Sequence, residues 1–159
     1  MKTAVVPGSF DPVTLGHIDL IRRTAALFDH VLAVAMINPD KRYRLTESQR
    51  LALLKQAVAD IPNVEIDFWD GMLWEYIRDR GACAVVKGIR NSADLSYEQD
   101  MAEYNRARGV ETVLLPASMK YVHLSSTEVR RRLDAGEALA GLVAPKAETL
   151  LREIWIKER

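Results

Sequence analysis

The chain of 159 residues has one cysteine, three histidines and no excess of either charge, since 22 lysines and arginines balance 22 aspartates and glutamates. The single cysteine, Cys83, excludes an intramolecular disulfide and a metal site built from several cysteines, and its apolar neighbours predict a buried thiol. The charge balance provides no overall field for DNA, RNA or an anionic membrane. A phosphate-bearing ligand would therefore have to be held by local groups.

Long apolar segments are also absent from the chain. No stretch of about 18 apolar residues occurs, and no charged start is followed by the apolar core of a signal peptide. We therefore expect a cytoplasmic protein with neither a nucleic-acid nor a membrane partner. The length and the hydrophobic fraction of 48% suit a sizeable core, so we expect one domain over residues 1–159.

Short apolar runs alternate with amphipathic patterns along the whole chain. Five runs are too short for helices and predict strands at residues 3–6, 31–36, 64–68, 84–87 and 112–115. Apolar residues at helical spacing predict helices that begin near Gly16, Thr46 and Leu73, a polar helix over 94–108 and a closing helix over 145–159. This alternation predicts a Rossmann-like, doubly wound α/β fold with a five-stranded parallel sheet.

The loop of residues 7–17, Pro-Gly-Ser-Phe-Asp-Pro-Val-Thr-Leu-Gly-His, joins the first strand to the first helix. In an open parallel sheet such a turn lies at the carboxyl ends of the strands, where the next helix offers N–H groups to an anion. Gly8 and Gly16 would allow a ligand to approach the backbone, and His17 could meet a phosphate. The same spacing is equally typical of an ordinary turn whose histidine caps the helix. The loop is neither a Walker loop nor a G-x-G-x-x-G motif.

Further polar groups follow the other predicted strands. Lys41 follows the second strand, Lys87-Gly88-Ile89-Arg90 ends the fourth, and Ser125-Ser126-Thr127 comes after the fifth. Because these strand ends share one edge of a doubly wound sheet, we expect a polyphosphate pocket there. Ser125 and Glu128 also fit a capping box, so the hydroxyls could do no more than begin a helix. At most two of the arginines at 130–132 can face a ligand, because successive helical residues point in different directions.

Two motifs give the chain a resemblance to a known superfamily. Thr14-Leu15-Gly16-His17 resembles the (H/T)-x-G-H signature of nucleotidyltransferases, and Leu124 to Arg130 resembles their I-S-S-T-x-x-R motif. Together with Lys41, the Lys87–Arg90 stretch and Asp94-Leu95-Ser96-Tyr97-Glu98, they make nearly the whole chain similar to the bacterial phosphopantetheine adenylyltransferase family. That resemblance implies an enzyme that transfers AMP from ATP to 4′-phosphopantetheine by direct in-line attack. The products would be dephospho-coenzyme A and pyrophosphate.

The resemblance also implies roles for individual side chains. The catalytic residues would be His17, which would stabilise the transition state at the α-phosphate, together with Lys41 and Arg90. Phosphopantetheine would be bound by Ser9, Lys41, Leu73 and Lys87. The ATP site would comprise Ser9, Phe10, His17, Gly88, Ile89, Arg90, Glu98, Tyr121, Val122, His123, Leu124, Ser125, Ser126 and Thr127. Because the attacking phosphate is already ionised near pH 7, positioning and charge neutralisation would supply the rate.

The family pattern further implies Mg²⁺ carried with ATP, a homohexamer and a pocket that would also suit coenzyme A as a feedback inhibitor. The sequence contains no dedicated metal ligands, which suits an ion held by phosphates and water. Lys87 replaces the Arg of some members, which keeps the charge but loses the bidentate fork. Two alternatives stay open. The chain could be a sister nucleotidyltransferase that acts on nicotinamide mononucleotide or uses CTP, or a catalytically silent nucleotide-binding module.

Overall fold

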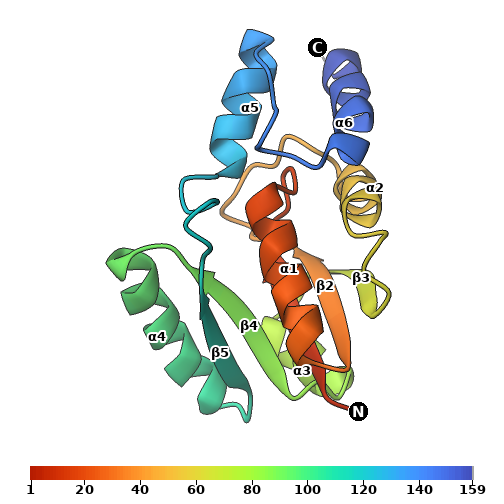
Figure 1. The fold of residues 1–159 in the computed structure, drawn as a ribbon. Helices are drawn as coiled ribbons and strands as arrows, with labels where there is room; N and C mark the ends of the chain where they lie inside the picture. The colour runs from red at the N-terminus through yellow and green to blue at the C-terminus, as the bar shows by residue number, and fades with distance from the viewer. Residues whose placement is uncertain (159) are drawn as a thin grey trace.

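The computed structural model describes residues 1–158, which form one five-stranded parallel sheet and six helices (Figure 1). The strands are β1 (Thr3–Gly8), β2 (His30–Met36), β3 (Val64–Trp69), β4 (Ala84–Ile89) and β5 (Glu111–Pro116). The helices are α1 (Leu15–Leu27), α2 (Glu47–Ala57), α3 (Leu73–Asp79), α4 (Ser92–Arg106), α5 (Ser126–Ala135) and α6 (Pro145–Lys157). The strand order β3-β2-β1-β4-β5 confirms the predicted doubly wound α/β fold.

Both faces of the sheet are buried, which explains why its central strands are continuously apolar. Ala4 and Val6 of β1 belong to one core, which contains residues of α1, α2, α5 and α6. Val5, between them, belongs to the second core, with Tyr76 and Ile77 of α3. Each such valine, fully removed from water, stabilises the fold by about 2 kcal/mol. The alternation along β1 therefore requires helices on both faces.

Side-chain caps fix where the helices begin. Thr46 and Gln49 form the predicted capping box of α2. The first helix begins at Leu15, one residue before the predicted start, because Thr14 caps it and accepts a hydrogen bond from His17 N. α4 begins at Ser92, since the side chain of Asn91 accepts a hydrogen bond from Asp94 N at 2.8 Å. The helix starts therefore follow local hydrogen bonding.

Helices α5 and α6 lie beyond the carboxyl end of the sheet, at the opposite end of the molecule from the N-terminus (Figure 1). α6 packs against α2, and the amide of Leu15 donates a hydrogen bond to the carbonyl of Leu142 at 2.8 Å. The predicted closing helix is thus present, although Arg159 lies outside the described residues. The hydrogen bond between Leu15 and Leu142 places the segment between α5 and α6 at the start of α1, and α5 itself meets the loop after β1 through Ser126, which donates to the carbonyl of Pro12.

The prediction of a buried thiol at Cys83 is wrong, because the residue is exposed. It lies in the turn before β4, at the edge of the sheet's apolar layer, and its Sγ is 3.2 Å from the carbonyl oxygen of Thr3. Apolar neighbours in sequence did not indicate burial, since Ala84 and Val85 are enclosed as members of the strand, whereas Cys83 precedes it. Within residues 1–158, no helix has the length and apolar character needed to cross a membrane.

Candidate active site

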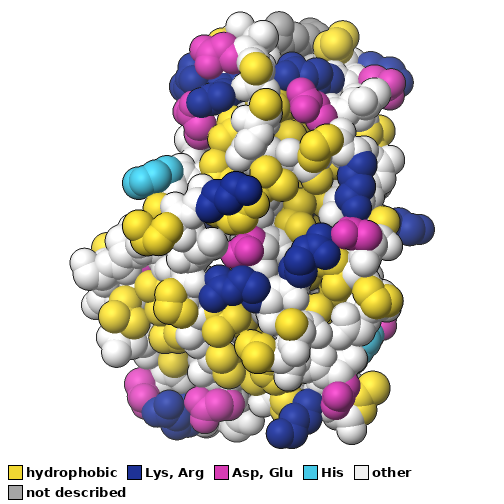
Figure 2. Space-filling view, in the orientation of Figure 1, with side chains coloured by type: hydrophobic (Ala, Val, Ile, Leu, Met, Phe, Trp, Pro, Cys, Tyr) yellow, Lys and Arg dark blue, Asp and Glu magenta, His cyan; other side chains and the backbone are white. Residues whose placement is uncertain are grey.

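A cavity of about 670 Å³ lies where the strand order reverses, between the carboxyl ends of β1 and β4. Crevices at such switch points are where open α/β sheets bind ligands. In the view of Figure 2, dark blue Lys and Arg side chains surround a carboxylate side chain near the middle of the face. The predicted site residues that line the cavity are Ser9, Phe10, His17, Lys41, Lys87, Gly88, Arg90, Glu98, Tyr121, Leu124, Ser125, Ser126 and Thr127.

Four predicted site residues are not part of the cavity lining. Leu73 packs against the second core, near the end of β3. Ile89, Val122 and His123 adjoin lining residues without themselves lining the cavity, and His123 is exposed. The structure thus brings together residues from β1, β4, α1, α4 and the start of α5, as the strand-end argument predicted.

His17 presents one ring nitrogen as a donor. Its Nδ1 accepts a hydrogen bond from the backbone N–H of Thr14 at 2.9 Å, so the proton of the neutral ring resides on Nε2. The ring also packs edge-on against Phe10, with the ring centroids 5.1 Å apart. Phe10 is itself 1% exposed and cannot easily move aside. The imidazole is therefore held from two sides, and its remaining donor is Nε2–H.

The environment of His17 keeps the imidazole neutral. Burial, together with the nearby positive charges of Arg90 and Lys87, lowers the pKa of His17 from 6.5 to about 4. At pH 7 the ring is therefore uncharged. It is not repelled by the neighbouring cations, and it can donate a hydrogen bond through Nε2–H. Such a donor can stabilise negative charge that develops on a phosphate oxygen.

Two cations from the end of β4 are held by carboxylates of α4. Lys87 Nζ lies 3.5 Å from Glu98 Oε1, and Arg90 Nε donates to Asp94 Oδ2 at 3.2 Å. Arg90 Nη1 also donates to the carbonyl of Leu124 at 3.2 Å. These contacts connect β4 and α4 with the segment that begins α5, and they orient both cations at the cavity.

At the start of α5, the second sequence motif contacts the loop that contains the first. Ser125 is the N-cap, and its Oγ accepts a hydrogen bond from Glu128 N at 3.1 Å. Ser126 Oγ donates to the carbonyl of Pro12 at 2.8 Å. Both hydroxyls therefore have structural partners, as the capping alternative predicted, while the helix N-terminus still faces the cavity.

Arg130 and Asp11 are site residues to which the sequence analysis gave no role. Arg130 Nη1 donates to the carbonyl of Asp11 at 2.7 Å, its Nη2 lies 3.2 Å from Thr127 Oγ1, and both residues line the cavity. Arg130 ends the second motif and Asp11 lies within the first loop, so the motifs themselves were the available signal. Arg23, Arg42 and Tyr43 also line the cavity, and no sequence pattern distinguished them.

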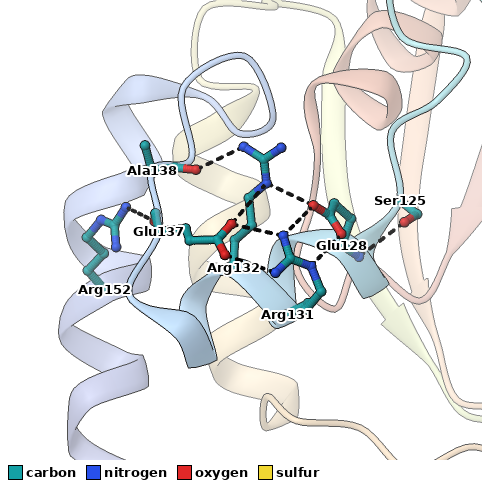
Figure 3. A network of polar contacts seen from close by, with 7 residues as sticks. All are labelled: Ser125, Glu128, Arg131, Arg132, Glu137, Ala138 and Arg152. Atoms are coloured by element: carbon teal, nitrogen blue, oxygen red, sulfur yellow. Dashed lines mark hydrogen bonds and ion pairs between the residues drawn. The ribbon is translucent and has the colours of Figure 1, made fainter.

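The other two consecutive arginines do not line the cavity, and they bind acidic residues (Figure 3). Arg131 pairs with Glu128 and Glu137 at 2.9 Å each, and Arg132 pairs with Glu128 at 2.9 Å. The side chain of Glu128 therefore pairs with these arginines and does not bind the backbone N–H of Ser125, as the predicted capping box would require. Of the three arginines only Arg130 lines the cavity, in keeping with the different directions of successive helical residues.

The carboxylates of the cavity are already occupied by partners within the protein. Asp11 accepts hydrogen bonds from the amides of Arg44 and Leu45 at 3.0 and 2.9 Å, while Asp94 and Glu98 pair with cations. Among the described residues 1–158, no group of three His, Cys, Asp or Glu side chains could hold a metal ion. The donor set thus suits phosphate oxygens and does not form a metal cage.

Comparisons with known proteins agree with this geometry. Residues 5–132 match the family model described as cytidylyltransferase-like. The chain is 45% identical to a phosphopantetheine adenylyltransferase from Caldanaerobacter subterraneus over 90% of this chain and 91% of that protein. It is 42% identical to the protein of the same name from Symbiobacterium thermophilum, over 99% and 98% of the two chains. A crystal structure assigned as a nicotinate-nucleotide adenylyltransferase from Vibrio parahaemolyticus superimposes with a TM-score of 0.75 at 21% identity, covering 100% and 97%, which shows a shared fold.

Proposed function

The chain belongs to the cytidylyltransferase-like family, and we propose that it transfers the adenylyl group of ATP to 4′-phosphopantetheine, a step of coenzyme A synthesis. The supporting observation is a neutral His17 whose Nε2–H donor belongs to a cavity lined with lysines and arginines. The names of the curated relatives specify the same transfer. The products are dephospho-coenzyme A and pyrophosphate.

In this reaction the attacking group is the phosphate of 4′-phosphopantetheine, which is ionised near pH 7 and needs no base. A phosphate oxygen attacks the α-phosphorus of ATP, and the bond to the β-phosphate oxygen breaks, which releases pyrophosphate. His17 donates Nε2–H to an α-phosphate oxygen as charge develops there. Ser9 and Lys41, which both line the cavity, orient the attacking phosphate.

The β- and γ-phosphates of ATP are assigned to Arg90 and the N-terminus of α5. Since the hydroxyls of Ser125 and Ser126 have partners within the protein, we assign the contribution of this segment chiefly to its backbone N–H groups. Lys87 is assigned to phosphopantetheine and Glu98 to the ATP side. Leu73, which does not line the cavity, is assigned to the pantetheine arm on the family pattern alone.

Mg²⁺ is part of the proposal as an ion that enters with the phosphates of ATP, and no residue of this chain is assigned to it. A cytoplasmic location is also proposed, and it is compatible with the free, exposed thiol of Cys83. For the homohexamer, the supporting feature is the set of large apolar side chains left exposed, among them Leu95, Tyr97 and Met119. Inhibition by coenzyme A is proposed because it shares the pantetheine arm of the substrate.

The proposed activity is tested by incubating the purified protein with ATP, MgCl₂ and 4′-phosphopantetheine and measuring dephospho-coenzyme A by mass spectrometry. We expect formation of this product in proportion to enzyme concentration. The His17→Ala variant serves as the control for a contaminating activity, because it should form the product at least about a hundredfold more slowly. Absence of dephospho-coenzyme A with the unmodified protein would contradict the proposal.

A further inference from the structure

Arg50, on α2, is a buried arginine without a carboxylate partner among the described residues. Its side chain is 2% exposed, and none of the ion pairs within residues 1–158 involves it. Its Nη1 donates to the carbonyl of Ser9 at 2.9 Å and to that of Met36 at 3.1 Å, while its Nε has no hydrogen-bond partner. Burying an unpaired charge is costly, so this placement calls for a compensating role.

The guanidinium of Arg50 lies against an aromatic ring of the cavity. Its Cζ is 4.2 Å from the ring centroid of Tyr43, which lines the cavity, and 6.0 Å from that of Phe68. A cation stacked on an aromatic face is stabilised most where water is excluded. Arg50 thus connects the end of β1 at Ser9, the end of β2 at Met36 and the ring of Tyr43.

Tyr43 in turn closes the turn that carries Lys41. The amide of Asn38 donates to Tyr43 Oη at 2.6 Å, and the amide of Lys41 donates to the carbonyl of Asn38 at 3.0 Å. Lys41 itself is exposed and has no side-chain contact of its own among those described. The position of its ammonium group therefore depends on the backbone of this turn, which is held by the hydrogen bond between Asn38 N and the hydroxyl of Tyr43.

We propose that Tyr43 and Arg50 are positioning residues for Lys41. Tyr43 stacks on Arg50, and Arg50 also donates to the carbonyl of Ser9. The stack thereby fixes the position of the turn that carries Lys41 relative to the loop after β1. This inference rests on the proposed function, in which Ser9 and Lys41 together orient the acceptor phosphate. Arginine suits this position because its Nη1 donates to the carbonyls of Ser9 and Met36 while the planar guanidinium presents a flat face to the ring, which a lysine does not have.

The inference is tested by a double-mutant cycle with Tyr43→Leu and Lys41→Ala. We expect Tyr43→Leu to raise KM for 4′-phosphopantetheine about tenfold, because residues in one network are coupled, and to leave the Kd for ATP unchanged. In the Lys41→Ala background the same substitution should change KM by less than about twofold. Multiplication of the two single effects would show that Tyr43 acts independently of Lys41 and would overturn the inference.

Two further variants separate the stack from other effects of Tyr43. Tyr43→Phe keeps the ring on Arg50 and loses the two hydrogen bonds of the hydroxyl, from Asn38 N and to the carbonyl of Met36, so KM should return to within about threefold of the unmodified value. Tyr104→Leu is the matched control. It removes a tyrosine that also stacks on an arginine, Arg108, at 3.5 Å, but this pair does not line the cavity. A rise in KM in the control equal to that of Tyr43→Leu would contradict the inference.

Hydrogen–deuterium exchange gives a readout that does not depend on turnover. In Tyr43→Leu, the amides of residues 38–43 should exchange at least about fivefold faster, while those of β1 should be unchanged. Unchanged exchange in the turn would show that Tyr43 does not order it and would overturn the inference. If the unmodified protein has no activity with phosphopantetheine, the proposed function fails, and the exchange result alone still decides whether the stack orders the turn.

Discussion

The neutral imidazole of His17 makes the stability of the protein depend on pH in a calculable way. Its pKa is lowered to about 4 in the folded protein, whereas an imidazole in the unfolded chain titrates near 6.5. As pH falls below 6.5, His17 binds a proton in the unfolded chain but stays unprotonated in the folded protein. Unfolding is therefore favoured by acid, and the contribution of His17 to stability is lost as pH falls through this range.

The size of the effect follows from the two pKa values. Between pH 7 and pH 4.5 the difference in proton binding lowers the free energy of unfolding by about 2 kcal/mol. The substitution His17→Gln removes the titrating ring but leaves a carbonyl that can accept the hydrogen bond from Thr14 N. The variant should therefore lose about 2 kcal/mol less stability over the same range.

The assay is denaturant unfolding of both proteins at pH 7 and pH 4.5, with the free energy extrapolated to water. All other titrating groups are common to the two proteins, so the difference isolates His17. Equal losses in the two proteins would contradict this prediction, because they would show that His17 has an ordinary pKa in the folded state. A second check is the pKa itself, read from the NMR shift of the imidazole. Bound ATP should raise this pKa, since its phosphates add negative charge beside the ring.

Three other substitutions test the site. His17→Ala should lower kcat about a hundredfold or more while ATP affinity stays intact, since the donor acts in the transition state; loss of ATP binding with turnover unchanged would contradict that role. Lys41→Ala should mainly raise KM for 4′-phosphopantetheine, and equal damage to ATP binding in the free enzyme, measured by calorimetry, would count against the assignment. Gly8→Ala should lower the free energy of unfolding by about 1–3 kcal/mol, because its Cβ would lie 3.0 Å from the buried ring of Phe10; a thermal midpoint equal to that of the unmodified protein would show that the ring moves freely.

The fold was largely predictable because its determinants are local. The apolar strands are separated by caps and turns that short sequence patterns encode, such as Thr46 with Gln49. The strand-end rule then placed Lys41, Lys87 and Arg90 at one cavity without any knowledge of contacts. Burial of single residues was less predictable, and Cys83 shows why: a turn residue can be exposed even between apolar neighbours.

The parts of the site that the sequence did not reveal depend on partners far away along the chain. Arg50 is buried because its partners are carbonyls at residues 9 and 36 and a ring at residue 43, and a helix pattern contains no sign of them. Asp11 likewise binds the amides of Arg44 and Leu45. The hydroxyl of Ser126, expected to meet a phosphate, donates instead to Pro12 across 114 residues of chain.

The identity of the acceptor is tested by measuring the release of pyrophosphate. The purified protein is given ATP and Mg²⁺ in parallel reactions, one with 4′-phosphopantetheine and one with nicotinamide mononucleotide. We expect release with phosphopantetheine and none above background with the mononucleotide. Release with the mononucleotide alone would contradict this expectation and would void the roles of Lys41, Leu73 and Lys87, while release with neither would favour a catalytically silent nucleotide-binding module.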